Sequence, residues 1–402
     1  ALAIVGGMVI ALVLIASPLY TAITSVTEQA EALPAPPDEP MIATDIVLTP
    51  GDDPPNIYFI LPDGYARADV LQEYYELDNQ PFIDFLRSQG FYVADNAPAN
   101  HTRTVAALPT LLNFADMREV LGDKFRGASN VDIFRTYTVR SRVRWLFQQA
   151  GYDVWYLASG VDAYNRIAAK NYLDANILLS EFETVFLNFT PIPLLAPSLG
   201  IRNPYDLQRQ SALFMAEELK RVARDAANPK FVFLHILIPH PPFVFDAEGN
   251  PVNPDYPFEM LDGSSLVDVH ISREQYVAQY RDQLIYTNTV LKDLVQSIRD
   301  TDPNAVIVLQ SDHGPGSQMN WSHLNRTNFH ERATILNALY LPGVEESQLY
   351  DSISPINTFP VIFNAYFGTD IPLLPDHSYF STSSNPLHFI RVEPDGPAAE
   401  TD

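Results

Sequence analysis

Three apolar segments of the chain are followed by side chains of the types that can bind metal ions. The run NIYFILP ends at Asp63, the run FVFLHILIP ends at His240, and the run AVIVLQ is followed one residue later by Asp312 and His313. Runs this apolar are typical of strands buried on both faces of a parallel sheet. In open α/β sheets, ligands collect at the carboxyl ends of the strands. The sequence therefore predicts that these four side chains meet at one edge of a sheet.

Helical patterns separate the predicted strands. Strands are expected at residues 56–62, 91–95, 152–158, 231–238, 305–310 and 336–341, and helices at 69–75, 81–89, 105–114, 141–150, 207–225, 274–299 and 355–367. Strands separated by helices indicate an α/β fold, with a mostly parallel central sheet covered by helices on both faces. Residues 162–202 follow neither pattern, and we expect an insertion near the site there.

The ligand types favour a divalent metal ion, although each motif also has a structural interpretation. Asp63 lies in Pro-Asp-Gly, which is typical of a turn, and His240 lies among prolines and fits an ordinary loop. An Asp-His-Gly tripeptide also occurs by chance. The combination at three strand ends is stronger than any one motif. Carboxylate oxygen and imidazole nitrogen suit Zn²⁺ or Mn²⁺, so we expect one tight site and allow for a second.

Thr104 is the candidate nucleophile. It follows His-Thr-Arg and begins the helix predicted from residue 105. A threonine at a helix start is most often an N-cap. As a nucleophile it would need its pKa lowered, which metal coordination achieves, and a helix N-terminus stabilises an anion held there. The capping interpretation and the nucleophile interpretation are compatible at this position.

Composition excludes several functional classes. The chain has 402 residues, a formal net charge of −24 and no cysteine. A surface this acidic repels nucleic-acid phosphates, so we expect no nucleic-acid partner. The lack of cysteine rules out disulfides, thiolate metal sites and a cysteine nucleophile.

The N-terminal region predicts a membrane anchor. Residues 2–20 carry no charge, and this run is long enough to form a transmembrane helix, which we expect at residues 1–21. A cleaved signal peptide is the alternative. Residues 22–55 are rich in proline and acids and read as a linker. No lysine or arginine precedes Arg67. Because cytoplasmic flanks are usually basic, we expect the rest of the chain at the cell membrane on the extracytoplasmic side.

These motifs together resemble the alkaline phosphatase/sulfatase superfamily. The resemblance covers residues 56 to about 343, and it is strongest to the branch of lipoteichoic-acid synthases and lipid A phosphoethanolamine transferases. Asp63 after the opening strand, Thr104 in T-V-A-A-L-P, His240 in PHPPF, and Asp312 with His313 fit that branch's motifs in order. The resemblance implies an alkaline-phosphatase-like three-layer sandwich, with a catalytic domain at residues 56–385 and a tail at 386–402.

The resemblance also implies roles for residues beyond the strand ends. A further histidine follows in the family, and His330 in N-F-H-E-R is our choice for it, with His323 as the rival near the substrate. His240 and His330 would bind the leaving group or a second metal. Arg332 would hold a phosphoryl oxygen.

The function implied is a membrane-anchored, metal-dependent phosphotransferase or phosphodiesterase. It would act on a lipid or glycan phosphodiester of the cell envelope. Thr104 would bind the metal held by Asp63, Asp312 and His313, attack phosphorus and form a phospho-threonine. The chain departs from formylglycine-dependent sulfatases, because residues 101–109 contain no C/S-x-P-x-R motif. The absent disulfides also argue against lipid A as the substrate. The alternatives are a hydrolase of phosphate or sulfate esters with the same fold, and a non-catalytic envelope scaffold.

Overall fold

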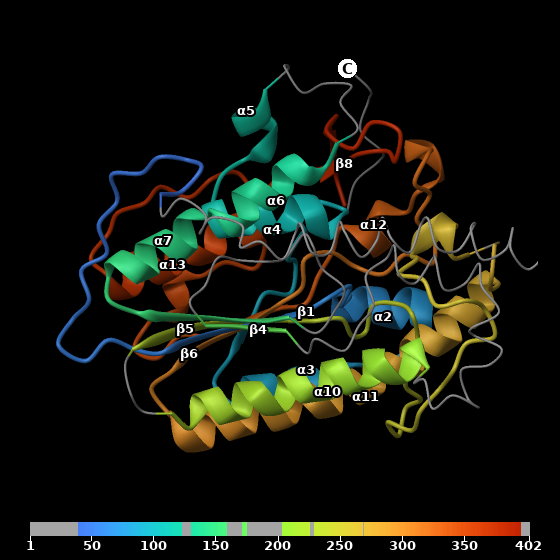
Figure 1. The fold of residues 1–402 in the computed structure, drawn as a ribbon, viewed down its shortest axis with the longest axis horizontal. Coiled ribbons are helices and arrows are strands. Elements are labelled where there is room, and N and C mark those ends of the chain that lie inside the picture. Colours follow the sequence, from blue (N-terminus) through green and yellow to red (C-terminus); the bar gives the residue numbers. More distant parts are fainter. Residues whose placement is uncertain are drawn as a thin grey trace, which may run out of the picture. The chain divides into compact units, whose positions relative to one another are not determined.

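The computed structural model describes residues 39–122, 130–158, 171–174, 203–225, 229–267 and 269–394 (Figure 1). They belong to one compact unit that begins at Glu39. The expected transmembrane segment at 1–21, the start of the linker and most of residues 162–202 lie outside the described residues. Among the helices that are described, none combines the length and the apolar character needed to cross a membrane.

A seven-stranded sheet forms the centre of this unit. Its strand order is β2-β7-β6-β1-β5-β3-β4. The bounds are β1 Ile57–Pro62, β2 Tyr92–Val93, β3 Asp153–Ala158, β4 Asn171–Asp174, β5 Lys230–Ile236, β6 Val306–Gln310 and β7 Asn337–Tyr340. The neighbours from β6 to β4 pair in parallel, and only the β6–β7 and β7–β2 pairs are antiparallel. The prediction of an α/β fold with a mostly parallel sheet is confirmed.

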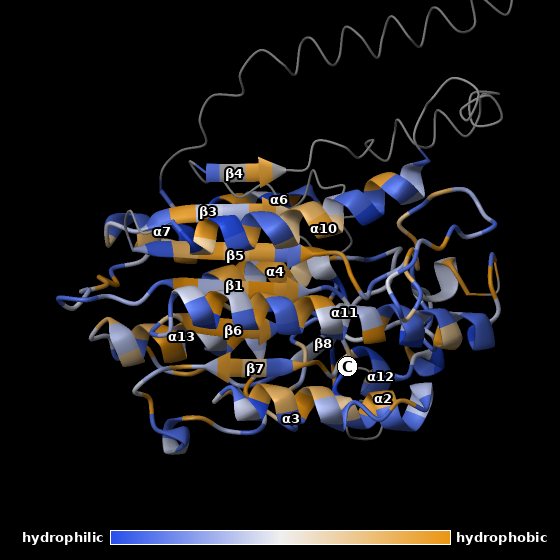
Figure 2. Cartoon of the chain, turned by 90° about the horizontal axis from the view of Figure 1, so that it is seen from below, coloured by the Kyte–Doolittle hydropathy of each residue, from blue (hydrophilic) through white to orange (hydrophobic). Residues whose placement is uncertain are grey.

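The middle strands are apolar because both faces of the sheet are covered. In β1, Tyr58 and Ile60 belong to one hydrophobic core, whereas Ile57, Phe59 and Leu61 belong to a second. Side chains alternate between the faces of a strand, so a strand between two helical layers needs apolar residues at every position. Figure 2 shows β1, β5 and β6 as mainly hydrophobic for this reason.

Helices pack on both faces of the sheet (Figure 1). The core that contains Tyr58 is completed by α2 Ala68–Tyr75, α3 Gln80–Ser88, α10 Pro204–Ala223 and α11 Arg273–Thr301. The core that contains Phe59 is completed by α4 Thr104–Asn113, α7 Arg142–Gln149 and α13 Pro355–Tyr366. The remaining α-helices described are α5 Met117–Leu121, α6 Asp132–Val139 and α12 Phe329–Arg332.

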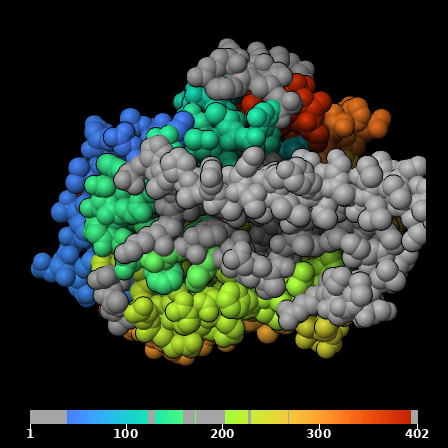
Figure 3. Space-filling model, in the orientation of Figure 1, coloured from blue at the N-terminus to red at the C-terminus, as the bar shows by residue number. Residues whose placement is uncertain are grey.

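Two segments that lie outside the predicted domain limits of residues 56–385 also pack on the domain. Residues 39–55, expected as linker, run along the surface (blue in Figure 3), where Leu48 is buried and the backbone N–H of Thr49 donates to Phe367. At the other end, β8 Ser378–Phe380 pairs with β9 Ile390–Val392 in an antiparallel hairpin that extends past residue 385.

Candidate active site

Two adjacent parallel strands bring the first site residues together. Asp63 directly follows β1, and Asp312 and His313 follow β6, the strand beside it. All three side chains are buried, and one ligand atom from each lies within 4.8 Å of the others. In the described part of the chain, this is the one group of three such side chains that can hold a metal ion.

The unpaired atoms of this group fit a cation. Asp63 Oδ1 and Asp312 Oδ2 are buried and have no hydrogen-bond partner among the described residues. The Nε2 atom of His313 lies 3.6 Å from that Asp63 oxygen and 3.3 Å from that Asp312 oxygen. Buried carboxylate oxygens without partners are costly. A divalent cation among two oxygens and one imidazole nitrogen would satisfy all three atoms.

The imidazole of His313 is held in an orientation suited to a ligand. Its Nδ1 lies 2.9 Å from the carbonyl oxygen of Gly314, so an N–H there donates to the backbone and leaves the Nε2 lone pair facing the carboxylates. Burial, together with the nearby Arg332 guanidinium, lowers the pKa of His313. The ring is therefore neutral, which is the form that binds metals.

Thr104 is the first residue of α4 and faces the same group. Its Oγ1 lies 3.1 Å from His313 Nε2. Arg103, with φ −138° and ψ 133°, is the N-cap residue, and no side chain caps this helix. The capping interpretation of Thr104 is therefore not what the structure has. The hydroxyl is directed at His313 of the metal-binding group, at the helix N-terminus.

The sequence missed His235, which supports Asp63 from the next strand. His235 is buried in β5, and its Nε2 lies 3.0 Å from Asp63 Oδ2. Burial alone raises the pKa of Asp63, but the adjacent His240, His235 and His313 hold it below its usual value. The carboxylate thus stays ionised with one oxygen engaged and the other open. A histidine inside the otherwise apolar run FVFLHILIP was the available signal.

Arg332 lies in this site and is fixed by an acid that the sequence also missed. Its Nη1 donates to Asp262 Oδ2 at 2.5 Å, and its Nη2 lies 3.3 Å from His313 Nε2. The Nε donates to the backbone oxygen of Thr102 at 3.0 Å. Asp262 also accepts from the hydroxyl of Tyr276 at 2.7 Å. Both members of the ion pair are buried, so the guanidinium is held next to His313.

His240 borders the same site. Its backbone N–H donates to Asp63 O at 3.0 Å, and its Nε2 lies 3.8 Å from Asp262 Oδ2. The rings of His240 and His313 have centroids 6.2 Å apart. His240 is partly buried, so it is placed where it can face a substrate.

His330 and His323 lie elsewhere. The Nε2 of His330 is 3.4 Å from Asp69 and 3.7 Å from Glu73, both on α2, and the ring meets Tyr74 edge-on. His323 is exposed, and its backbone N–H donates to Asn320. Neither histidine belongs to the group of Asp63, Asp312 and His313. A second metal site on His240 and His330 stays a prediction.

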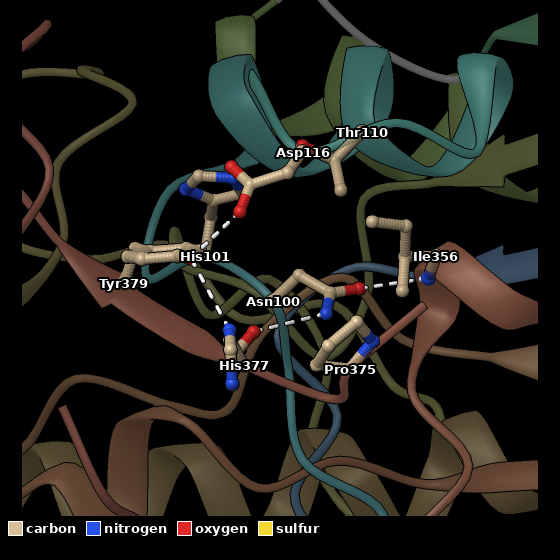
Figure 4. A pocket seen from close by; sticks show the side chains of 8 residues that line it. All are labelled: Asn100, His101, Thr110, Asp116, Ile356, Pro375, His377 and Tyr379. Carbon is tan, nitrogen blue, oxygen red and sulfur yellow. Dashed lines mark hydrogen bonds between the residues drawn. The ribbon is translucent and has the colours of Figure 1, made fainter. Parts of the chain in front are cut away.

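A small polar cavity lies beside the segment that precedes Thr104. It is lined by Asn100, His101, Thr110, Asp116, Ile356, Pro375, His377 and Tyr379 (Figure 4). Its volume of about 10 Å³ is that of a single water site. The Tyr379 hydroxyl donates to Asp116 at 2.7 Å and lies 3.5 Å from His377 Nδ1. None of these residues belongs to the metal-binding group, so the cavity is a separate feature.

Comparison with known proteins identifies the family. The family model described as Sulfatase matches residues 55–359, which is more than half of the chain. The matched range contains Thr104, Arg332 and the metal-binding group of Asp63, Asp312 and His313. The chain belongs to the sulfatase family. This confirms the resemblance to the alkaline phosphatase/sulfatase superfamily. No curated protein sequence matches this sulfatase-family chain.

Solved structures share the fold at low sequence identity. The C-terminal periplasmic domain of EcEptC from Escherichia coli, in complex with zinc, has a TM-score of 0.57 at 15% identity and covers 86% of this chain and 96% of its own. A phosphonate monoester hydrolase of Agrobacterium radiobacter has 0.52 at 14%, covering 81% and 80%. The integral membrane lipooligosaccharide phosphoethanolamine transferase EptA of Neisseria meningitidis has 0.51 at 12%, covering 87% and 61%. At these identities the likeness shows the fold of the sulfatase-family chain and leaves its reaction open.

Proposed function

We propose that this sulfatase-family enzyme transfers or cleaves a phosphoryl group through Thr104, with Zn²⁺ or Mn²⁺ held by Asp63, Asp312 and His313. The observation that carries the proposal is the position of the Thr104 hydroxyl. It lies at a helix N-terminus, 3.1 Å from His313 Nε2, the atom that also faces two buried carboxylate oxygens without partners. A nucleophile, a cation site and an anion-stabilising helix end thus coincide.

The reaction proceeds in two displacements. Thr104 Oγ attacks phosphorus, and the bond from phosphorus to the leaving-group oxygen breaks, which gives a phospho-threonine. The hydroxyl proton passes through solvent to the departing oxygen, which leaves as an alcohol. An acceptor alcohol or water then attacks the same phosphorus and restores the threonine hydroxyl. A bound divalent ion supplies charge neutralisation at the phosphoryl oxygens and favours the ionised hydroxyl.

The surrounding residues take positioning roles in this proposal. Arg332, fixed by Asp262, holds a phosphoryl oxygen near His313. His240 borders the site and is available to the leaving group. His330 would join it only if it left its contacts with α2.

Phosphoryl transfer is favoured over sulfate-ester hydrolysis by the nucleophile. Formylglycine is made from cysteine or serine, and this chain has no cysteine and carries threonine at position 104. Phosphoethanolamine transferases and a phosphonate monoester hydrolase are among the structures that share the fold. We propose a lipid or glycan phosphodiester of the cell envelope as substrate, with membrane attachment through residues 1–21.

The test is a substrate panel with two variants of the nucleophile. The purified protein, supplied with Zn²⁺ or Mn²⁺, is assayed on chromogenic phosphodiester, phosphomonoester and sulfate-ester substrates, with and without an acceptor alcohol. Thr104→Ala is expected to lower kcat by a factor on the order of a thousand or more, because the covalent route is lost. Thr104→Ser keeps a hydroxyl and should keep measurable turnover with a phospho-serine detectable by mass.

Two results would count against the proposal. If Thr104→Ala kept most of the wild-type activity, water would be the nucleophile. If sulfate esters alone were turned over, the phosphoryl assignment would be wrong although the fold and the metal-binding group would stand. Metal titration of both variants is the control, since Asp63, Asp312 and His313 remain in each.

A further inference from the structure

Arg103, the residue before the nucleophile, has a partly buried guanidinium that none of the roles above uses. It lies over the indole of Trp321, with Cζ 4.2 Å from the ring centroid. Its Nη2 donates to Ser383 Oγ at 2.9 Å, whereas its Nε is buried without a hydrogen-bond partner in the described part of the chain. Among the described residues, Arg103 also has no carboxylate partner. The cation is therefore held in place by a ring and a hydroxyl that do not neutralise it.

A second guanidinium lies against the same ring. Arg332 Cζ is 5.2 Å from the Trp321 centroid. The indole Nε1 of Trp321 donates at 2.7 Å to the backbone oxygen of Asp262, the residue whose carboxylate pairs with Arg332. Trp321 thus fixes both arginines relative to each other. The charge of Arg332 is balanced by Asp262, and the charge of Arg103 is not.

The electrostatics of Arg103 favour an anionic ligand. Burial and then repulsion from Arg332 lower its pKa to about 10, so it remains a cation near neutral pH. A partly buried cation without a carboxylate is costly unless an anion reaches it. A tetrahedral phosphate matches this demand, since guanidinium groups pair with phosphoryl oxygens through strong, directional hydrogen bonds. The N-terminus of α4, ten residues long, adds to the positive potential.

We propose that Arg103 is a second phosphoryl-binding cation, so that phosphoryl oxygens of the substrate bind between Arg103 and Arg332 beside Trp321. The assignment rests on the proposed function and deepens it, because it names a residue that binds the substrate of Thr104. Arg332 contacts the group from the side of His313, and Arg103 contacts it from the side of Ser383. Trp321 is then a positioning residue for both.

The test measures phosphate binding apart from turnover. Inorganic phosphate is titrated by calorimetry into the zinc-loaded full chain and into two variants, Arg103→Gln and Arg103→Lys. The loss of one charged hydrogen-bonding group is expected to weaken phosphate binding by about ten- to a hundredfold in Arg103→Gln. Arg103→Lys keeps the charge but lacks the planar guanidinium, so its phosphate affinity should lie between those of the wild type and Arg103→Gln. Zinc affinity should not change.

Arg87→Gln is the matched control. Arg87 is an exposed arginine on α3, paired with Asp95, and its loss should leave phosphate affinity unchanged. If Arg103→Gln bound phosphate as tightly as the wild type, Arg103 would only support Trp321 and the inference would be overturned while the proposed function stood. If the zinc-loaded wild type bound no phosphate and turned over no phosphate ester, the proposed function would fail with it. Should Arg103→Gln not fold, an unchanged affinity in Arg103→Lys would overturn the inference equally.

Discussion

Single side chains decide what this site can hold. Asp63 has one oxygen engaged by His235 and one left open. His313 has one ring nitrogen engaged by a carbonyl, and the other faces Thr104 and the two carboxylates. Each ligand is thus oriented by a partner behind it, which fixes the face that it presents. The fixed orientation explains how three buried polar groups can converge without pairing off with each other completely.

His101, which lies three residues before Thr104, is expected to make the fold sensitive to acid. Its ring packs against Tyr379 and Phe389, and burial lowers its pKa from 6.5 to about 4. Below pH 6.5 the unfolded chain binds a proton at this residue that the folded chain does not bind until about pH 4. The free energy of unfolding therefore falls as the pH drops through that window. The loss attributable to His101 approaches about 3 kcal/mol.

The measurement is chemical denaturation of wild type and His101→Gln at several pH values between 6.5 and 4. The wild type should lose more stability than the variant across this range, because glutamine does not titrate. Exposed His323→Gln serves as the control and should follow the wild type. Parallel pH dependence of wild type and His101→Gln would mean that the buried ring is not the source of the acid sensitivity.

At the scale of elements, burial explains which parts of the sequence could be interpreted. β1, β5 and β6 are covered on both faces, so their apolar runs predicted both the strands and the candidate metal-binding side chains that follow them. The edge strand β4 and the hairpin β8–β9 are only four and three residues per strand, too short for a pattern to emerge. The helices α5 and α6 were also not predicted, and α5 has only five residues.

The contacts of His330 follow from its position in a short helix. The helix α12 is four residues long, and consecutive side chains on a helix point about 100° apart. Phe329, Glu331 and Arg332 are buried, so His330 is the residue of this turn that points outward, toward α2. Asp262 and His235 were missed for a different reason. Asp262 lies in a loop and His235 lies inside β5, and no sequence spacing indicates that they are near Arg332 and Asp63.

Gly314 follows His313 directly and packs closely against the backbone of α12, so the small size of this residue should be critical. A Cβ at this position would lie 2.1 Å from the backbone oxygen of Glu331 and 2.9 Å from that of Thr334. Backbone atoms cannot move aside as a flexible side chain can. Gly314→Ala should therefore shift the loop that carries Asp312 and His313 and destabilise the fold by about 1–3 kcal/mol. Zinc affinity should fall with it.

Gly51→Ala is the control for this substitution, because nothing lies within 4 Å of a Cβ there. Thermal unfolding and zinc titration of both variants give the comparison. Wild-type zinc affinity in Gly314→Ala would show that the loop adjusts without moving its ligands, which would contradict the close packing described here.

The whole molecule combines an acidic chain with a pair of neighbouring arginines beside the nucleophile. The formal net charge is −24, yet Arg103 and Arg332 lie together beside the nucleophile. Acidic surroundings do not favour polyanions such as nucleic acid, whereas two fixed guanidinium groups favour a single phosphoryl group. The acidic net charge follows directly from the composition. The pairing of the two arginines depends on their tertiary contacts with Trp321, and composition carries no information about those contacts.

The predicted extracytoplasmic location of the domain can be tested with one introduced cysteine, because the chain has none. No lysine or arginine precedes Arg67, so the positive-inside rule places the described domain outside the cytoplasm if residues 1–21 span the membrane. Ser347 is exposed and Ser354 is buried. A membrane-impermeant maleimide should label Ser347→Cys in intact spheroplasts and should leave Ser354→Cys unlabelled until the protein is denatured. Labelling of Ser347→Cys only after lysis would place the domain in the cytoplasm and remove envelope lipids and glycans from the possible substrates.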